Sequence, residues 1–147
     1  MASSAYAWVE TADNGPQQIT VCWIRGTATA VSGSVVVLNT ATPTYPGKEV
    51  TGSTTAGNQI YGVIDGTGAD LTELANGKWV RVQTYGYVPI IRLDASVVVA
   101  GDPLYTSGTT LRAGQTDAVG SVSGSTIAFT ARPTGNANGT TDGFIGL

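Results

Sequence analysis

The sequence contains no histidine and only one cysteine, Cys22. Without histidine the chain lacks the commonest general base and the commonest zinc ligand, and one thiol can form neither an internal disulfide nor a thiolate zinc site. Catalytic serine–histidine and cysteine–histidine pairs are therefore excluded. A single cysteine is in keeping with a reducing compartment, and the alternating pattern around Cys22 favours a small buried side chain.

Charged residues and long apolar runs are also scarce. Only 12% of the 147 residues are charged, and the net charge is −3. The basic residues are scattered, so we expect no direct nucleic-acid partner. No apolar run approaches the ~20 residues that span a bilayer, and residues 1–15 lack the basic and apolar parts of a signal peptide. We therefore expect a soluble protein without membrane contact, and no cofactor or metal.

The residues that are abundant favour strands joined by turns. Threonine is frequent and there are 20 glycines, which suit half-buried strands and tight corners respectively. The length fits one domain. We predict an extended N-terminal arm over residues 1–17 and one all-β domain over 18–147, folded as a small β-barrel or β-sandwich.

Most of the chain divides into short strand-like segments. In the first, Ile19, Val21 and Trp23 alternate with Thr20 and Cys22 and are predicted to share one face. The loop at 40–59 is predicted to contain one short strand at 49–51, and Pro89 to lie at a bend or on an edge strand. The other predicted strands are 18–24, 34–39, 60–64, 79–94, 96–101, 103–105, 118–122, 125–131 and 143–147.

One short helix is predicted near residues 70–76. Asp70 can accept hydrogen bonds from the first backbone N–H groups, and Glu73 follows three residues later, as in a capping box. Gly77 ends the pattern. At about two turns this helix must be held by packing.

Carboxylates are the remaining candidates for chemistry. For glycoside hydrolysis two carboxylates must face each other across about 5–9.5 Å, but the acids here fall almost wholly in turns. Asp102 lies between Gly101 and Pro103, where glycine permits a bend and proline fixes φ, so we interpret Asp102 as a turn corner.

Two further motifs have simpler structural explanations. Asp65, Thr67 and Asp70 offer alternating oxygens as a calcium loop does, but the closing bidentate glutamate is missing, and a turn followed by a helix cap is the plainer explanation. Asn138-Gly139-Thr140 matches a glycosylation sequon, but asparagine–glycine is first a tight-turn signal.

Aromatic residues supply the candidate binding positions. Tyr6 and Trp8, in the predicted arm, either fold back on the core or dock on a partner. Trp79, Tyr85 and Tyr87 share one strand parity and could form a platform on one face, or a core or oligomer contact.

Three segments, in this order, resemble a known family. They are "VRVQTYGYVP" (80–89), "VVVAGDPLYTSGTTLRAG" (97–114) and "GSTIAFTARPTGNANGTTDGFIGL" (124–147). With their "GDPL" turn and closing "IA-x-x-A…G-x-I" hairpin, residues 60–147 resemble the small β-rich capsid decoration proteins (cement or head-stabilising proteins) of tailed bacteriophages.

The resemblance implies a non-enzymatic virion protein on the capsid exterior, assembled in the host cytoplasm. Its implied partner is the major capsid protein, which it would bridge as a homo-oligomer, a trimer being one form, and it implies no catalytic residue. Two other hypotheses stay open. One is a carbohydrate-binding or adhesin-like β module on a virion or cell surface, and the other is a small hydrolase that uses acids alone.

Overall fold

The computed structural model describes residues 7–12, 15–25, 30–55, 57–66, 77–94, 103–107, 109–114, 128–130 and 139–146. Four of the predicted features lie outside these residues: the helix at 70–76, the strands at 96–101 and 118–122, and the turn at Asp102.

The described residues form ten strands and no helix, so the predicted all-β class is confirmed. The short strand predicted at 49–51 coincides with β4, and two described strands, β1 and β8, have no predicted counterpart. The strands are β1 (Ala7–Ala12), β2 (Gly15–Ile24), β3 (Val35–Leu38), β4 (Glu49–Thr51), β5 (Gly62–Ile64), β6 (Lys78–Arg92), β7 (Tyr105–Thr106), β8 (Ala113–Gly114), β9 (Ala128–Thr130) and β10 (Thr140–Ile145).

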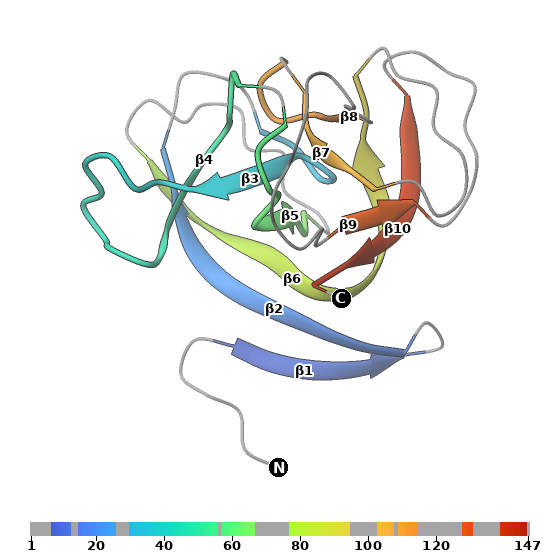
Figure 1. Ribbon diagram of the computed structural model, residues 1–147. Helices are drawn as coiled ribbons and strands as arrows, with labels where there is room; N and C mark the ends of the chain where they lie inside the picture. The colour runs from blue at the N-terminus through green and yellow to red at the C-terminus, as the bar shows by residue number, and fades with distance from the viewer. Residues whose placement is uncertain are drawn as a thin grey trace.

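Five of the strands close into a small barrel. β2 pairs with β6, β6 with β5, β5 with β3 and β3 with β4, all antiparallel. The ring closes where β4 pairs in parallel with the end of β2, Trp23 opposite Glu49 and Ile24 opposite Val50. In Figure 1, β2 and β6 curve side by side beneath the shorter strands β3, β4 and β5. Of the two architectures predicted, the barrel is the one observed.

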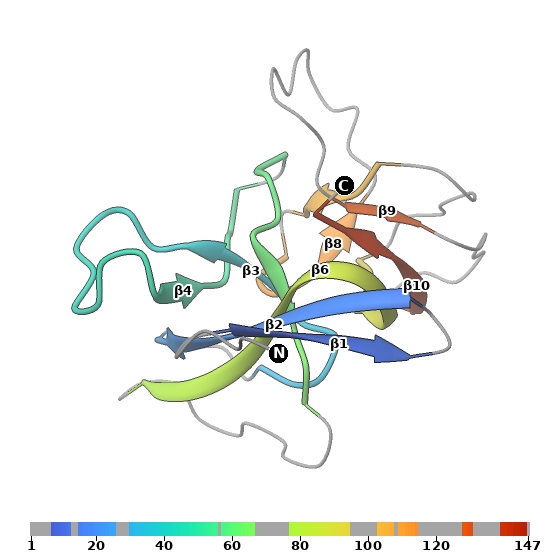
Figure 2. The same cartoon turned by 90° about the horizontal axis from the view of Figure 1, so that it is seen from below.

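β6 continues beyond the barrel and supports a second group of strands. Its C-terminal half pairs with β10, and β10 pairs with β9. A bridge between Leu93 and Ala113 brings the β7–β8 hairpin against the end of β6. Figure 2 shows β8, β9 and β10 on one side of β6, with β3 and β4 on the other.

The bend predicted at Pro89 is a β-bulge. The pairing passes from Ile91 opposite Thr141 to Val88 opposite Gly143, so that Pro89 and Ile90 stand against the single residue Asp142. Because a bulged residue donates no ladder hydrogen bond, the missing N–H of proline costs nothing there.

The barrel and its extension each have an apolar core. One cluster fills the barrel: Cys22, Ile24, Ala30, Val36, Val50, Ile64, Val80, Val82 and Leu111. The other lies between β6, β10 and the hairpin: Val35, Ile60, Val63, Val88, Ile91, Leu93, Leu104, Ala113 and Ile145. β3 supplies both clusters because its adjacent residues Val35 and Val36 point to opposite faces.

At the end of β2, Cys22 and not Trp23 faces the core of the barrel. Cys22 and Ile24 are fully buried in the barrel, whereas Val21 and Trp23 are only half-buried. Because successive side chains of a strand alternate, burying the small thiol of Cys22 turns the large ring of Trp23 outward.

The predicted free arm over residues 1–17 is not confirmed. Residues 7–12 form β1, which pairs along its whole length with β2, from Ala7 opposite Thr20 to Ala12 opposite Gly15. The predicted domain boundary at residue 17 falls inside β2. β1 occupies one end of the strand order and lies outside the barrel in Figure 1. β1 and β2 therefore form an antiparallel pair where the sequence predicted an unpaired arm.

Candidate interaction surface

Three aromatic rings meet on the outside of the barrel, and we call them the aromatic cluster. Trp23 of β2 stands directly opposite Trp79 of β6. Their ring centroids are 5.3 Å apart and their planes are inclined at 70°. Tyr45, from the loop between β3 and β4, lies 5.3 Å from Trp23 and 5.0 Å from Trp79. These are the distances of favourable edge-to-face contacts.

The outer two rings of the aromatic cluster face solvent. Trp79 is 48% exposed and Tyr45 is 39% exposed. Trp23 lies deeper, because a Cβ placed on Gly77 would come within 2.4–2.5 Å of its indole atoms. Gly77 has φ +74°, so both its backbone and the space above it require glycine. Trp23 is thus the base of the cluster, and Trp79 and Tyr45 are its exposed surface.

A buried carboxylate holds the loop that carries Tyr45. Glu49 of β4 is fully buried, and its Oε2 accepts the backbone N–H groups of Thr44 at 2.6 Å and Tyr45 at 3.3 Å. Its Oε1 accepts the amide of Asn39 at 2.7 Å and lies 3.2 Å from Nη2 of Arg25. One side chain therefore holds the first residue and the middle of the loop, and its ion pair with Arg25 links the loop to the end of β2.

The same contacts keep Glu49 ionised. Burial favours the neutral acid and works to raise its pKa, but the bonds from Asn39, Thr44 and Tyr45, together with the charge of Arg25, outweigh burial. The pKa of Glu49 is consequently held below its ordinary value.

Two arginines share the face of the barrel on which the aromatic cluster lies. Arg25 follows Trp23 by two residues and shares its face of β2, and Arg81 stands in the same relation to Trp79 on β6. The carbonyl of Lys48 accepts the backbone N–H of Trp23 at 2.8 Å. Lys78 precedes Trp79 on β6 and is exposed, but strand alternation places it on the opposite face, where its partner across the ladder is the buried Ile24.

The platform predicted from Trp79, Tyr85 and Tyr87 is divided between two places. Trp79 belongs to the aromatic cluster, whereas Tyr87 packs on Phe144 of β10, with ring centroids 5.6 Å apart. Tyr85 lies six residues from Trp79, which is roughly 20 Å along an extended strand. The alternation of side chains along one strand therefore grouped three rings that are not in contact with one another. It did not identify Trp23 and Tyr45, which come from other segments and pack against Trp79.

The Tyr87 hydroxyl has its own anchor on β10. It donates to Oδ2 of Asp142 at 2.6 Å, and Asp142 is 6% exposed. This bond joins the two strands across the bulge at Pro89. The side chain of Tyr87 is thus engaged in contacts with Asp142 and Phe144 of β10.

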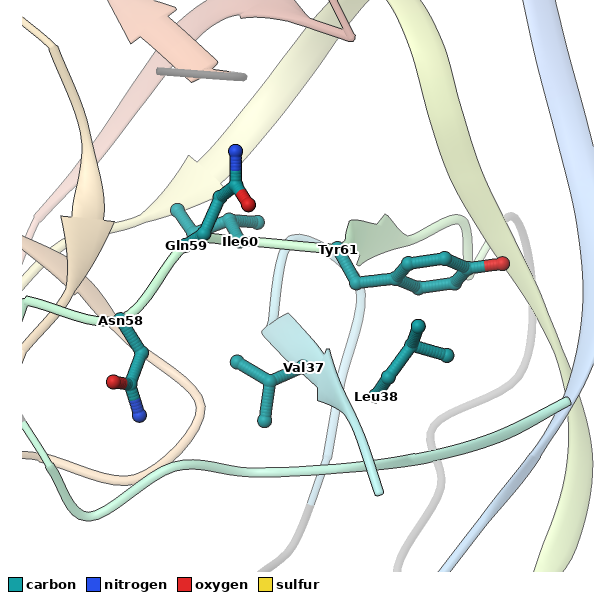
Figure 3. Close-up of a pocket in the computed structure, with 6 residues that line it drawn as sticks. All are labelled: Val37, Leu38, Asn58, Gln59, Ile60 and Tyr61. Carbon is teal, nitrogen blue, oxygen red and sulfur yellow. The ribbon is translucent and has the colours of Figure 1, made fainter. Parts of the chain in front are cut away.

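A shallow cavity of about 340 Å³ opens beside β3. Figure 3 shows Val37 and Leu38 of β3 on one side of it and the segment Asn58, Gln59, Ile60, Tyr61 on the other. None of these six side chains is ionised at neutral pH, so the cavity walls offer no acid–base pair.

The predicted buried cysteine is confirmed. Cys22 is fully buried beside Tyr61. Burial raises the pKa of its thiol to about 11, although a hydrogen bond with Tyr61 opposes the shift. A thiol with this pKa stays protonated at neutral pH and is a poor nucleophile.

The acids with described side chains each have a separate partner. Asp65 lies 3.1 Å from Nη2 of Arg81, and the Thr109 hydroxyl donates to Asp94 at 2.7 Å. Glu49 and Asp142 have the partners given above. Over the described part of the chain, no group of three or more histidine, cysteine, aspartate or glutamate residues could hold a metal. Thr67 and Asp70, needed for the calcium hypothesis, lie outside that part, as does Asn138 of the sequon.

Of the two aromatic residues predicted to bind a partner, Trp8 lies on β1, where its backbone is paired with Ile19. Tyr6 lies outside the described residues. β1 is one of the two edge strands of the larger sheet. Trp8 therefore belongs to a strand paired with β2 and not to a free arm.

Comparison with known proteins identifies no relative. No protein-family model matches the sequence, and no curated protein matches it. Among the described residues there is no helix long and apolar enough to cross a membrane.

Proposed function

We propose that this protein is a non-enzymatic virion structural protein that binds the outer surface of a tailed-phage capsid. In this role it stabilises the mature head by bridging copies of the major capsid protein, itself acting as a homo-oligomer. The observation that carries the proposal is the arrangement of the segments on which the family resemblance rests.

Those segments lie next to one another in the fold. The "VRVQTYGYVP" segment is the centre of β6, and the final segment contains β9 and β10, of which β10 pairs with β6. The "GDPL" segment leads into the β7–β8 hairpin, which reaches β6 through Leu93 and Ala113. A motif set scattered over 68 residues (80–147) thus belongs to one structural unit. That grouping supports the idea that the three segments resemble the decoration-protein family as one structural unit, and not as three separate strand-and-turn patterns.

The fold also has the mechanical features that such a role needs. A closed barrel gives a rigid body, and β1 leaves one backbone edge at the end of the sheet. A strand edge can pair with a strand of the capsid. Each bound copy then stabilises the lattice state that presents its site, by mass action.

The test is saturable binding to shells. Purified protein is mixed with mature and with immature shells of the phage that encodes it, both stripped of the protein, and the bound fraction is measured by co-sedimentation. We expect saturable binding to mature shells and weaker binding to immature ones. No binding to mature shells, or absence of the protein from purified virions by mass spectrometry, overturns the proposal.

A deletion of residues 1–12 tests the docking edge. Because β1 pairs only with β2 among the described strands, its removal leaves the barrel ring complete. We expect weaker shell binding with the barrel still folded. Unchanged affinity would remove β1, and with it Trp8, from the docking surface.

The second candidate is a carbohydrate-binding module, and the exposed ring of Trp79 favours it. Sugars stack on such rings. Binding on a glycan array that disappears in a folded Trp79→Ala variant would select this candidate instead.

A further inference from the structure

The ladder between β3 and β5 opens into the cavity described above. Val36 stands opposite Gly62, and the same register carried further places Leu38 opposite Ile60. These two residues lie on opposite walls of the cavity (Figure 3). The last backbone bond across the ladder runs from the N–H of Tyr61 to the carbonyl of Val36, at 2.9 Å. The cavity therefore occupies the place where the next pair of the ladder would be.

The backbone of Leu38 points toward the cavity. Asn39, the next residue, donates its N–H to the carbonyl of Glu49 on β4 at 2.9 Å. Because backbone groups alternate in direction along a strand, the N–H and C=O of Leu38 point away from β4, toward residues 58–61. In the described part of the chain, the backbone of Leu38 and of Ile60 forms no hydrogen bond across the cavity. Ile60 is fully buried, and since buried backbone groups almost always have partners, these groups are available to a ligand.

The two walls of the cavity are held by different strands. The end of β3 is held by its pairing with β4, where Val37 stands opposite Thr51. The other wall is held by β7: the N–H of Asn58 donates to Oγ1 of Thr106 at 3.0 Å, and the N–H of Thr106 donates to the carbonyl of Asn58 at 3.0 Å. Nδ2 of Asn58 also donates to Oγ of Ser53 at 3.0 Å. Separate anchors keep the cavity open before a ligand binds, which lowers the entropic cost of binding.

The walls suit an uncharged ligand with an apolar part. A charged ligand would lose hydration there without meeting a counter-charge, because none of the six lining side chains is ionised at neutral pH. Leu38 is 37% exposed and Val37 is half-buried, so both offer apolar surface. Tyr61, the one ring among the six, already packs against the barrel core, so its ring is not an open platform for a sugar.

An extended peptide matches the unpaired backbone groups. Its N–H and C=O groups alternate along both edges, as required to bond Leu38 on one wall and Ile60 on the other. A cavity of about 340 Å³ lies at the low end of the ~300–1,000 Å³ typical of ligand sites, so it holds a few residues and not a full strand. Unpaired backbone groups at the end of a ladder are those that bind peptides by strand addition.

We propose that this cavity binds a short extended peptide segment with uncharged, apolar side chains, which hydrogen-bonds to the backbone of Leu38 on one wall and of Ile60 on the other. The site uses no residue of β1, the edge strand assigned to the capsid above. The inference therefore goes beyond the proposed function and does not depend on it.

The first experiment measures peptide binding by the full chain. The probes are four acetylated and amidated tripeptides in which valine, isoleucine, leucine or phenylalanine stands between two threonines. Amide ¹H–¹⁵N spectra are recorded during each titration. We expect at least one tripeptide to shift the amide signals of Leu38 and Ile60 saturably and to slow the exchange of both N–H groups with deuterium about tenfold or more. The same tripeptide N-methylated at its central residue lacks one backbone donor and should bind about tenfold more weakly.

The second experiment changes one wall of the cavity. Leu38→Glu places a charge in the apolar wall, and the control Ile90→Glu makes the same change on β6 at a side chain of similar exposure: 43% for Ile90 and 37% for Leu38. We expect Leu38→Glu to weaken binding of the tripeptide about tenfold or more. Ile90→Glu should change it by less than about twofold. Thermal unfolding establishes that both variants are folded.

Several results would overturn the inference. They are saturable binding of none of the four tripeptides, equal binding of the N-methylated probe, and unchanged binding to a folded Leu38→Glu variant. Signals that move on β1 in place of Leu38 and Ile60 overturn it in favour of strand addition at the sheet edge. Binding of methyl glucoside or methyl galactoside at these amides, with no tripeptide bound, overturns it in favour of a neutral sugar. Shell binding is measured separately, so the decoration role and this inference fail independently.

Discussion

The carboxylate of Glu49 accepts the backbone N–H of Tyr45 at 3.3 Å, so a charge buried on β4 positions an exposed ring on the outside of the barrel. The contact is local in sequence, four residues apart, but Glu49 itself is held by Arg25 on β2. Glu49 therefore lies where the loop, the β2–β4 pairing and the aromatic cluster meet.

Replacement of this carboxylate should be costly. In Glu49→Gln an amide nitrogen must face one of the donors from Asn39, Thr44 or Tyr45, which leaves a buried donor without an acceptor. We expect a clear loss of stability in urea unfolding and a change in tryptophan fluorescence as Tyr45 moves. Asp65→Asn is the matched control, because it also converts a carboxylate paired with an arginine but lies nearer the surface. The control should lose less than about 0.5 kcal/mol. Equal losses in the two variants would show that burial of Glu49 contributes nothing.

The depressed pKa of Glu49 also predicts a pH dependence. A carboxyl group whose folded pKa lies below its ordinary value of 4.5 binds protons more readily when unfolded. Its contribution to stability is therefore present above pH 4.5 and is lost as the pH falls through the folded pKa. Urea unfolding at pH 7, 5, 4 and 3 should show stability falling below about pH 4.5, and the fall should be smaller in Glu49→Gln. The same fall in both proteins would assign the acid sensitivity to other carboxylates.

Gly77 should tolerate alanine poorly for two separable reasons. Its φ of +74° is left-handed, which costs a residue with a Cβ about 1–2 kcal/mol, and the added atom would meet the indole of Trp23. Gly47 has the same φ of +74°, with nothing within 4 Å of its added Cβ. Gly47→Ala therefore measures the backbone cost alone. We expect Gly77→Ala to be the more destabilising in urea unfolding and the only one of the two to alter tryptophan fluorescence. Equal effects would mean that Trp23 moves aside at no cost.

The bond from Tyr87 to Asp142 should contribute to the pairing of β6 with β10. Tyr87→Phe removes the hydroxyl donor from a carboxyl group that is 6% exposed, and we expect a loss of about 1–3 kcal/mol. Tyr85→Phe is the control, since Tyr85 is 38% exposed on the same strand, and it should change stability by less than about 0.5 kcal/mol. Both values come from chemical denaturation. Equal stability of the two variants would show that the hydroxyl–carboxyl bond does not hold the strands.

Cys22 should be protected from alkylation in the folded protein. It is fully buried and burial raises the pKa of its thiol to about 11, so little thiolate is present near pH 8. Iodoacetamide should leave the native protein unmodified and label it in concentrated urea, as followed by mass spectrometry. Rapid labelling of the native protein would indicate that the barrel opens at β2.

The positions of strands were predictable because they depend on neighbouring residues. Val80 and Val82 are alternate residues of the predicted strand 79–94, as is typical of a strand with one apolar face, and both are buried. The short strand at 49–51 was predictable from its place among turn residues. The outward turn of Trp23 was not, because either face of β2 offers apolar side chains and only the partners in the barrel decide between them.

The sequence by itself determined the all-β class, most strand positions, the burial of Cys22 and the absence of any histidine-based chemistry. These follow from composition and from the two-residue period of a strand. Closure of the barrel and the meeting of Trp23, Tyr45 and Trp79 were decided by the tertiary structure. Trp23 and Trp79 are 56 residues apart in the sequence, and their contact exists because β2 and β6 pair in one register while Glu49 draws the loop of Tyr45 onto them. Such contacts depend on pairing between distant segments, which no local pattern encodes.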